Sequence, residues 1–245
     1  NNGGSITYSY ATGSVSASNL SRVGGLIGTN NSGTVTNAYA MGAVTGDGSV
    51  GGLAGQNGGT ITNVFATGMV AGNSIVGGLI GQIVSSSDTF ANAYFDTQTT
   101  GQSVGYGDSN GTHGTITAET TAQLQGALPS GFDSSVWSTG TGLYPYLTYQ
   151  FSSTPQAITG TVYGSTGSAL AGASVTGAVN GTIYNSASSG ANGYYYVLVP
   201  GGTIASNAGV LAYTTSPSNG ADAVTASASV GGLDIVTGYL TQDTT

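Results

Sequence analysis

The chain has 245 residues, of which only 4% are charged, with a formal net charge of -8, one basic side chain (Arg22) and one histidine. Nucleic-acid binding relies on several Lys or Arg side chains that neutralise phosphates, so we expect no nucleic-acid partner. The absence of cysteine excludes disulfides and thiolate metal sites. No apolar run approaches the roughly 18 residues of a membrane span, so we expect no transmembrane segment. Solubility must come from Ser, Thr, Asn and Gly, which is typical of secreted surface proteins.

The first part of the chain consists of repeats with a period of about 26 residues. The copies are GGSITYSYATGSVSASNLSRVGGLIGTN, SGTVTNAYAMGAVTGDGSVGGLAGQN and GGTITNVFATGMVAGNSIVGGLIGQI, followed by a degenerate fourth, DTFANAYFDTQTTGQSVGYG. The Gly-Gly-Leu triplets begin at Gly24, Gly51 and Gly77. Gly, Thr and Val dominate each copy, which disfavours helix and favours short strands separated by glycine corners. In the third copy we expect three strands, at 60–66, 69–71 and 74–81.

If each copy is one turn of a coil, here called a rung, the pattern predicts a β-solenoid in which equivalent residues stack at about 4.8 Å. Four side-chain ladders are then expected: Ile6, Val35 and Ile61; Leu26, Leu53 and Leu79; Tyr10, Tyr39, Phe65 and Tyr94; and Asn37, Asn63 and Asn92. We interpret the aromatic and asparagine ladders as core and corner structure rather than as a ligand site.

The repeats resemble the GLUG motif of filamentous-haemagglutinin-like bacterial surface proteins and exoproteins, here as Gly-Gly-Leu-Ile-Gly-Gln and Tyr-Ala-Thr-Gly. The resemblance extends from Gly3 to about Phe151 and includes a closing segment, at about 88–151, with YFDTQTTGQS, TAETTAQLQGALPSGFDSSVW and GLYPYL. It implies a secreted β-solenoid with an adhesion-related role and brings no catalytic residues. Three to four rungs make a short stack for this family.

A second module follows a linker at 152–157 and is expected to occupy residues 158–245. Its segments ITGTVYGSTGSALAGASVTG, ANGYYYVLVPGG and VLAYTT alternate apolar and polar residues between turn residues, as antiparallel strands do. From Ile158 to about Tyr213 they resemble the carboxypeptidase-regulatory-like, or transthyretin-like, module. That resemblance implies an immunoglobulin-like β-sandwich without catalysis of its own. The pairing of strands after Asp222 stays open.

Polar residues that could form a catalytic or metal site are scattered. The acids occur singly, at Asp47, Asp88, Asp96, Asp108, Glu119, Asp133, Asp222, Asp234 and Asp243. We interpret Asp47 and Asp108 as turn residues, place Arg22 in a loop insertion, and expect His113 to be a solvated loop residue. We therefore predict no catalytic residue, no cofactor and no metal. Sequons at Asn19, Asn30, Asn110 and Asn180 are candidate glycosylation sites in loops.

The favoured function is a non-enzymatic extracellular structural or adhesive protein. We expect a subunit of a cell-surface fibre or filament, a homo-oligomer assembled by end-to-end β-strand contacts, because the first rung has no evident cap. One alternative is a module of a large secreted adhesin that binds glycans or a host surface. A second, less favoured alternative is a β-helix carbohydrate-active enzyme.

Overall fold

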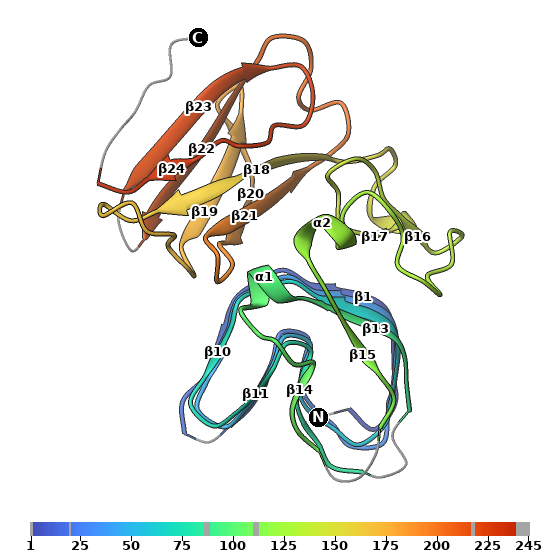
Figure 1. Ribbon diagram of the computed structural model, residues 1–245. Coiled ribbons are helices and arrows are strands. Elements are labelled where there is room, and N and C mark those ends of the chain that lie inside the picture. The colour runs from blue at the N-terminus through green and yellow to red at the C-terminus, as the bar shows by residue number, and fades with distance from the viewer. Residues whose placement is uncertain (1, 20, 86–88, 110–112, 217–218, 239–245) are drawn as a thin grey trace.

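The computed structural model describes residues 2–19, 21–85, 89–109, 113–216 and 219–238. The chain is all-β, as expected, and has three parts: a β-solenoid of about four turns, a closing segment along its side, and a β-sandwich next to both (Figure 1).

The solenoid has four short strands in each of its first three rungs. They are β1 (Ser5–Ala11), β2 (Val15–Ser16), β3 (Arg22–Gly24) and β4 (Ile27–Asn30); β5 (Thr34–Ala40), β6 (Val44–Gly46), β7 (Ser49–Gly51) and β8 (Ala54–Asn57); and β9 (Thr60–Ala66), β10 (Val70–Gly72), β11 (Ile75–Gly77) and β12 (Ile80–Ile83). The fourth rung has β13 (Thr89–Asp96), helix α1 (Thr97–Thr100) and β14 (Tyr106–Ser109), and β15 (Ile116–Glu119) then pairs with β13. Equivalent strands pair in parallel and in register.

The prediction of three strands per repeat was wrong, because the single strand expected at 74–81 is two strands separated by a corner. The Gly-Gly-Leu triplet makes that corner. A Cβ on Gly52 would collide with the carbonyl oxygen of Gly78 in the next rung, so the stacked corners have no room for a side chain there. The leucine that follows, Leu53, points into the core and is completely buried.

A left-handed residue in the first strand of each rung decides which side chains enter the coil. Asn37 has a φ of 53°, and Asn63 and Asn92 have nearly the same value. Because this kink interrupts the alternation of the strand, Val35 and Ala38 both lie in the solenoid core, while Tyr39 faces outward. Asparagine tolerates this conformation better than most residues, which explains its repetition.

The closing segment packs on the outer face of the sheet that contains β5, β9 and β13. It contains α2 (Thr121–Leu124), β16 (Trp137–Ser138), β17 (Tyr146–Leu147) and a 3-10 turn, η1 (Thr148–Gln150). Its aromatic side chains form a second hydrophobic core with the outward-facing rings of the solenoid.

The first strand of the sandwich, β18, begins at Gln156. One sheet contains β18 (Gln156–Tyr163), β21 (Tyr194–Val199) and β24 (Ile235–Val236), and the other contains β19 (Ser174–Val179), β20 (Thr182–Ser188), β22 (Ala208–Ser216) and β23 (Gly220–Ala226). All pairs are antiparallel except β18 with β24, which is parallel. The strands after 219 thus complete both sheets of this sandwich.

Candidate interaction surface

The aromatic ladder forms a stack of rings on the outer side of the solenoid, not in its core as the sequence indicated. Tyr10, Tyr39, Phe65 and Tyr94 lie in register on β1, β5, β9 and β13. The ring centroids of Tyr10 and Tyr39 are 5.4 Å apart, and those of Tyr39 and Phe65 are 4.9 Å apart, with nearly parallel planes. Tyr10, Tyr39 and Phe65 therefore stack on one another along the solenoid axis, whereas the Tyr94 ring packs edge-on against Phe132 at 5.7 Å.

The closing segment covers the inner members of this stack. Trp137 lies 6.1 Å from the Tyr39 ring and 5.9 Å from the Phe65 ring, centroid to centroid. Gln150 Nε2 donates a 2.7 Å hydrogen bond to the Tyr39 hydroxyl, and burial raises the pKa of Tyr39 above its ordinary value. Tyr10 has no such cover and is 45% exposed. The stack is therefore closed along its side and open at its first-rung end.

Two asparagine ladders run along the solenoid. In the first, Asn92 donates to Asn63 (2.8 Å) and Asn63 donates to Asn37 (3.2 Å). The indole of Trp137 also donates to Asn37 (3.1 Å), so the closing segment ends this ladder. The equivalent residue in the first rung is Tyr8, which adopts the same left-handed conformation with a φ of 49°.

The sequence analysis did not identify the second ladder. Asn2 donates to Asn30 (3.0 Å), and Asn30 donates to Asn57 (2.7 Å), at the corner between successive rungs. All three side chains are buried. The alignment of Asn2, Asn30 and Asn57 at the ends of the repeats was the available signal.

Asp96 is another residue whose role the sequence analysis missed. Its carboxylate is completely buried where the solenoid meets the closing segment. One oxygen caps α1 by accepting from the backbone of Gln98 (2.9 Å) and Thr99 (3.2 Å), and the other accepts from the hydroxyls of Thr121 (2.7 Å) and Tyr144 (2.6 Å). Burial, followed by the Asp96 carboxylate, holds the pKa of Tyr144 well above its ordinary value, so this hydroxyl keeps its proton and donates. An Asp before a short Thr-rich helix that ends at glycine was a readable capping signal.

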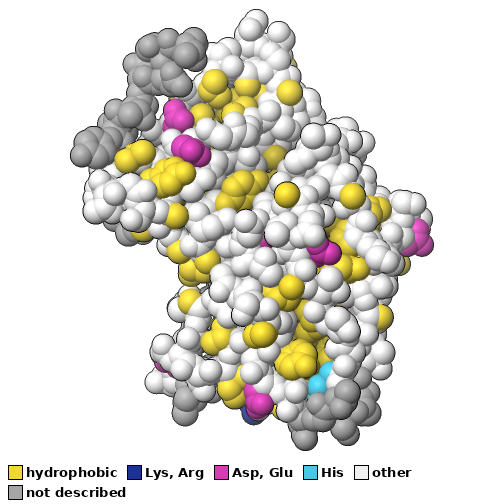
Figure 2. All heavy atoms as spheres, in the orientation of Figure 1, with side chains coloured by type: hydrophobic (Ala, Val, Ile, Leu, Met, Phe, Trp, Pro, Cys, Tyr) yellow, Lys and Arg dark blue, Asp and Glu magenta, His cyan; other side chains and the backbone are white. Residues whose placement is uncertain are grey.

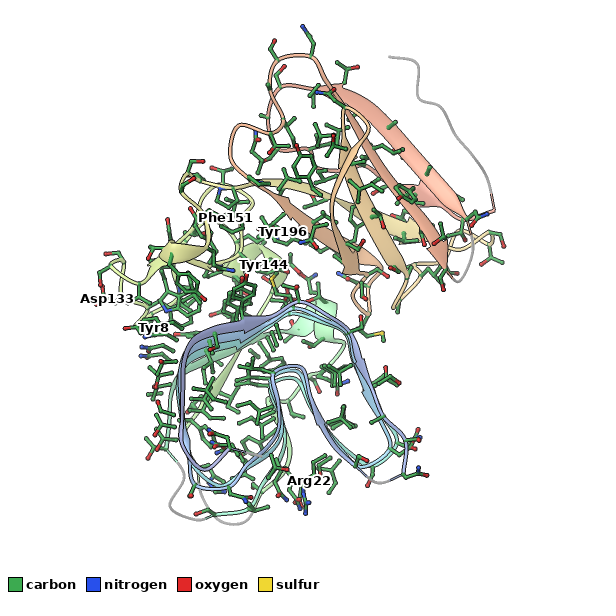
Figure 3. The ribbon with its side chains drawn as sticks, turned by 180° about the vertical axis from the view of Figure 1, so that it is seen from behind. Tyr8, Arg22, Asp133, Tyr144, Phe151 and Tyr196 are labelled. Atoms are coloured by element: carbon green, nitrogen blue, oxygen red, sulfur yellow. The ribbon has the colours of Figure 1, made fainter. Side chains whose placement is uncertain are left out.

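The first rung exposes strand edges that inner rungs bury. Within the described residues, β1, β2 and β3 each pair on one side only, and the outer edge of β4 is bridged by Asn2, which pairs in parallel with Asn30. Figure 3 shows this end facing the reader, with Tyr8 and Arg22 on it and no other ribbon across it. Ile6 and Leu26 are only partly buried here, whereas Val35 and Leu53, one rung further in, are completely buried. Tyr8 and Tyr10 lie on the same strand and are both exposed.

The acids and the histidine were predicted to be scattered, and the described residues bear on this for metal binding. Across the described part of the chain, no group of three or more His, Cys, Asp or Glu side chains could hold a metal ion. In Figure 2 the carboxylates are a few small magenta groups, two of them close together on the sandwich, on a largely uncharged surface.

The structure corrects three of the predicted positions and agrees with a fourth. Asp108 lies in β14 and accepts from Gln82 (3.3 Å), so it is not a turn residue. Arg22 begins β3 rather than lying in a loop insertion. His113 is not a solvated side chain: both ring nitrogens are buried, and the ring lies between those of Phe90 and Tyr106. Asp47 lies in a bend, as predicted.

The four sequons differ in accessibility. Asn19 and Asn180 are exposed and have left-handed backbones, as turn residues often do. Asn30 is buried, and its amide is engaged on both sides by Asn2 and Asn57, so a sugar on Asn30 would break the corner ladder. Asn110 lies outside the described residues.

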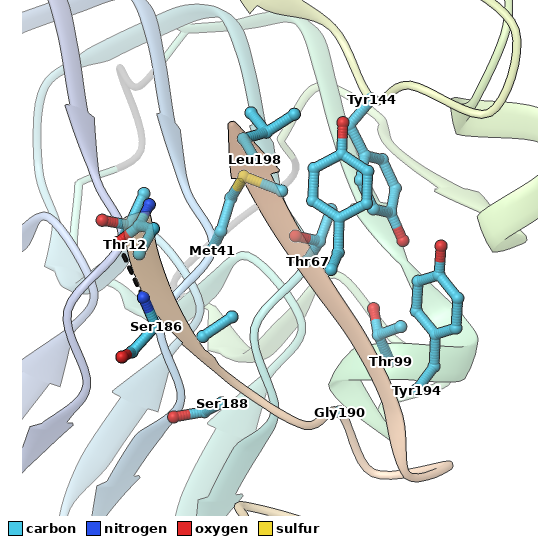
Figure 4. A pocket seen from close by; sticks show the side chains of 13 residues that line it. Thr12, Met41, Thr67, Thr99, Tyr144, Ser186, Ser188, Gly190, Tyr194 and Leu198 are labelled. Atoms are coloured by element: carbon cyan, nitrogen blue, oxygen red, sulfur yellow. Dashed lines mark hydrogen bonds between the residues drawn. The ribbon is translucent and has the colours of Figure 1, made fainter. Parts of the chain in front are cut away.

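The seam between solenoid and sandwich contains a small cavity of about 50 Å³ (Figure 4). Met41 and Thr67 line it from the solenoid, and Thr99, Tyr144 and Tyr196 line it from α1, the closing segment and β21. The hydroxyls of Thr99 and Tyr196 are buried, with no hydrogen-bond partner in the described part of the protein. A water molecule needs roughly 10 to 15 Å³ measured in this way, so the cavity has room for about three to five waters. We therefore interpret this cavity as a packing defect in the interface between solenoid and sandwich rather than as a ligand site.

Comparison with known proteins identifies one repeat. The family model described as the GLUG motif matches residues 46–71, which run from β6 to β10. This repeat is similar to the GLUG motif. Neither the curated proteins nor the solved structures include a match to the chain. The residues that the structure describes contain no helix long and apolar enough to cross a membrane. The solenoid of about four turns therefore contains one repeat, at residues 46–71, that is similar to the GLUG motif.

Proposed function

We propose that this protein is a non-enzymatic, extracellular surface protein with a structural or adhesive role, and that units contact one another end to end through solenoid strands to form a fibre. The observation that carries this proposal is the first rung of the described residues, where the unpaired outer edges of β1, β2 and β3, a partly buried core and the exposed rings of Tyr8 and Tyr10 meet. Unpaired strand edges are templates for pairing with another chain. The GLUG-type repeat supports placing the protein among repeat-type surface proteins.

Electron microscopy and light scattering of the purified protein test this function. We expect concentration-dependent assemblies in which the solenoid ends are in contact and the spacing along the assembly is regular. Particles that remain monomeric at every concentration, together with an absence of assemblies in material taken from the cell surface, would refute a fibre-forming role.

A second candidate function is a module of a larger adhesin that binds a glycan or a host surface. The favouring observation is the group of exposed aromatic side chains, Tyr8, Tyr10 and Tyr149, on an uncharged surface, because sugars stack on such rings. This function predicts saturable retention of a glycan by the isolated monomer. Tyr10→Ala should abolish retention, while Tyr184→Ala, which alters an exposed tyrosine on the sandwich, should leave it unchanged. Lack of retention on a broad glycan panel would remove this candidate.

For the second module we propose the role of a carboxypeptidase-regulatory-like spacer. Its support is the two-sheet architecture with an apolar centre that includes Ile158, Val175 and Val210. The seam to the solenoid is held by Ala191, whose N–H donates to the Thr99 carbonyl (2.7 Å), and by Gln125, which donates to the Tyr194 hydroxyl (3.1 Å). Such contacts would hold the spacer at a fixed orientation to the repeats.

A further inference from the structure

One side of the solenoid carries a regular array of hydroxyl groups. At the start of β5, Val35 packs in the solenoid core, so its neighbours Thr34 and Thr36 point outward. The other three first strands repeat this arrangement around Ile6, Ile61 and Phe90. The outward positions, in rung order, are Ser5 and Thr7, Thr34 and Thr36, Thr60 and Thr62, and Thr89 and Ala91. Seven of these eight positions carry a hydroxyl, and we call them the threonine face.

The strand pairing fixes the spacing of the threonine face. Two rows of Cα partners cross the rungs: Ser5, Thr34, Thr60 and Thr89, and Thr7, Thr36, Thr62 and Ala91. Paired strands lie about 4.8 Å apart, and residues two apart in one strand are separated by about 6.6 Å. The outward side chains therefore form a rectangular net with these two repeats.

This net is flat. Adjacent strands in most sheets are rotated by about 20 to 25° relative to one another, which would make the rows fan out. Here β1, β5, β9 and β13 overlie one another in the view along the solenoid (Figure 1). The Oγ1 atoms of Thr36 and Thr62 lie 3.0 Å apart and share a hydrogen bond, so these rungs hold their hydroxyls in register as well as their backbones.

The threonine face is accessible and uncharged. Both residues of the first rung and both of the fourth are exposed, and those of the inner rungs are exposed or half-buried. The closing segment packs on side chains beyond the left-handed asparagines, such as Tyr39, and not on these rows. Val, Ile or Tyr would satisfy strand propensity equally well, and Lys or Glu would satisfy solubility. Neither requirement explains why hydroxyl groups occupy this face.

A flat net of hydroxyls matches a crystalline surface better than a flexible ligand. The prism faces of hexagonal ice present oxygen atoms in a rectangular net of closely similar dimensions. A threonine hydroxyl can both donate and accept, as a lattice water does, and a bridging water binds nearly as well as a direct hydrogen bond. No strongly hydrated charge interrupts the rows, and they contain no aromatic ring on which a sugar could stack. This chemistry favours ice over a crystalline polysaccharide.

We propose that the threonine face binds ice, with its two rows of hydroxyls holding a layer of water in the arrangement of the ice lattice. The binding site is the face itself, and its ligand is the ordered water of the crystal surface. The face lies along the side of the coil rather than at its end. This inference is therefore independent of end-to-end contacts between units, and it adds a ligand to the proposed surface role.

Partition into slowly growing ice tests this binding. A cold surface immersed in a dilute solution of the protein freezes part of the liquid, and solutes without affinity for ice stay in the liquid. The protein should be enriched several-fold in the ice relative to a non-binding protein of similar size in the same solution. It should also slow the coarsening of small ice crystals held just below the melting point.

Two substitutions place a bulky ring in the middle of the net. Thr36→Tyr and Thr62→Tyr keep a strand-forming residue, so circular dichroism and thermal melting should show an intact fold. Each variant should lose the enrichment in ice, because the ring lifts the lattice away from the neighbouring hydroxyls. The matched control is Thr225→Tyr, which alters an exposed threonine on β23 of the sandwich and should leave the enrichment unchanged.

The remaining outcomes would overturn the proposal. Exclusion of the unchanged protein from ice, at the level of the non-binding protein, would remove ice as the ligand. Retention of the protein on crystalline cellulose or chitin, combined with exclusion from ice, would assign the face to a polysaccharide instead. Enrichment that survives in folded Thr36→Tyr and Thr62→Tyr would place the ice contact elsewhere. None of these results depends on whether fibres form, which electron microscopy measures separately.

Discussion

Replacement of Asp96 by alanine should destabilise the protein more than any other single carboxylate change. The substitution removes the cap of α1, worth about 1 kcal/mol. It also removes the acceptor of the buried Tyr144 hydroxyl, and an unsatisfied buried donor costs about 1 to 3 kcal/mol. Thr121 and the Thr99 N–H lose the same acceptor. We therefore expect the free energy of unfolding to fall by about 3 to 5 kcal/mol.

Urea denaturation followed by tryptophan fluorescence measures this change, because Trp137 belongs to the same hydrophobic core as Tyr144. Asp96→Asn keeps the shape and the helix-capping oxygen, so it should cost less than Asp96→Ala. Asp133→Ala is the matched control: its exposed carboxylate accepts from the Ser135 N–H, and its loss should cost under about 1 kcal/mol. A loss below about 1 kcal/mol for Asp96→Ala would refute the view that this carboxylate joins the solenoid to its closing segment.

Three further predictions concern the stacked rungs. Leu53→Ala should lower the free energy of unfolding by about 2 to 5 kcal/mol in urea titrations. Leu26→Ala should lower it less, because Leu26 is only partly buried in the first rung. Equal losses for the two variants would contradict the burial assigned to these leucines. Asn57→Ala should cost about 1 to 3 kcal/mol, because it leaves the Asn30 amide without its acceptor; a neutral result would remove the corner ladder from the stabilising contacts. Burial raises the pKa of Tyr39 above the value of about 10 in unfolded chains. The unfolded state then loses protons first as pH rises, so stability should be constant below about pH 10 and fall above it. Circular dichroism of urea-unfolding curves at a series of pH values measures this fall, and Tyr39→Phe should make it smaller; the same pH dependence in Tyr39→Phe and in the unchanged protein would contradict this prediction.

Much of the architecture could be predicted because repetition makes register readable. The period of about 26 residues and the Gly-Gly-Leu triplets place equivalent residues on successive rungs, and β9 has the predicted bounds. The predicted strand at 74–81 failed because alternation alone does not show that Gly78 and Leu79 form a corner.

The sequence did not show whether the aromatic side chains point into the solenoid or away from it. Period-two alternation places Val35, Asn37 and Tyr39 on one face of a regular strand. The left-handed backbone of Asn37 shifts that alternation and turns Tyr39 outward, where the closing segment covers it. This reversal depends on one dihedral angle and on a segment about a hundred residues away, which bonds to Asn37 through Trp137.

The sequence by itself determined the all-β class, the rung length, the in-register stacking and the low charge of the surface, because each follows from local composition or from repetition. Only the tertiary structure decided which side of each strand is buried and that Asp96 joins two parts of the chain. These features depend on contacts between residues far apart in sequence, such as Gly105 with Ile116 and Asp96 with Tyr144, which no local pattern records.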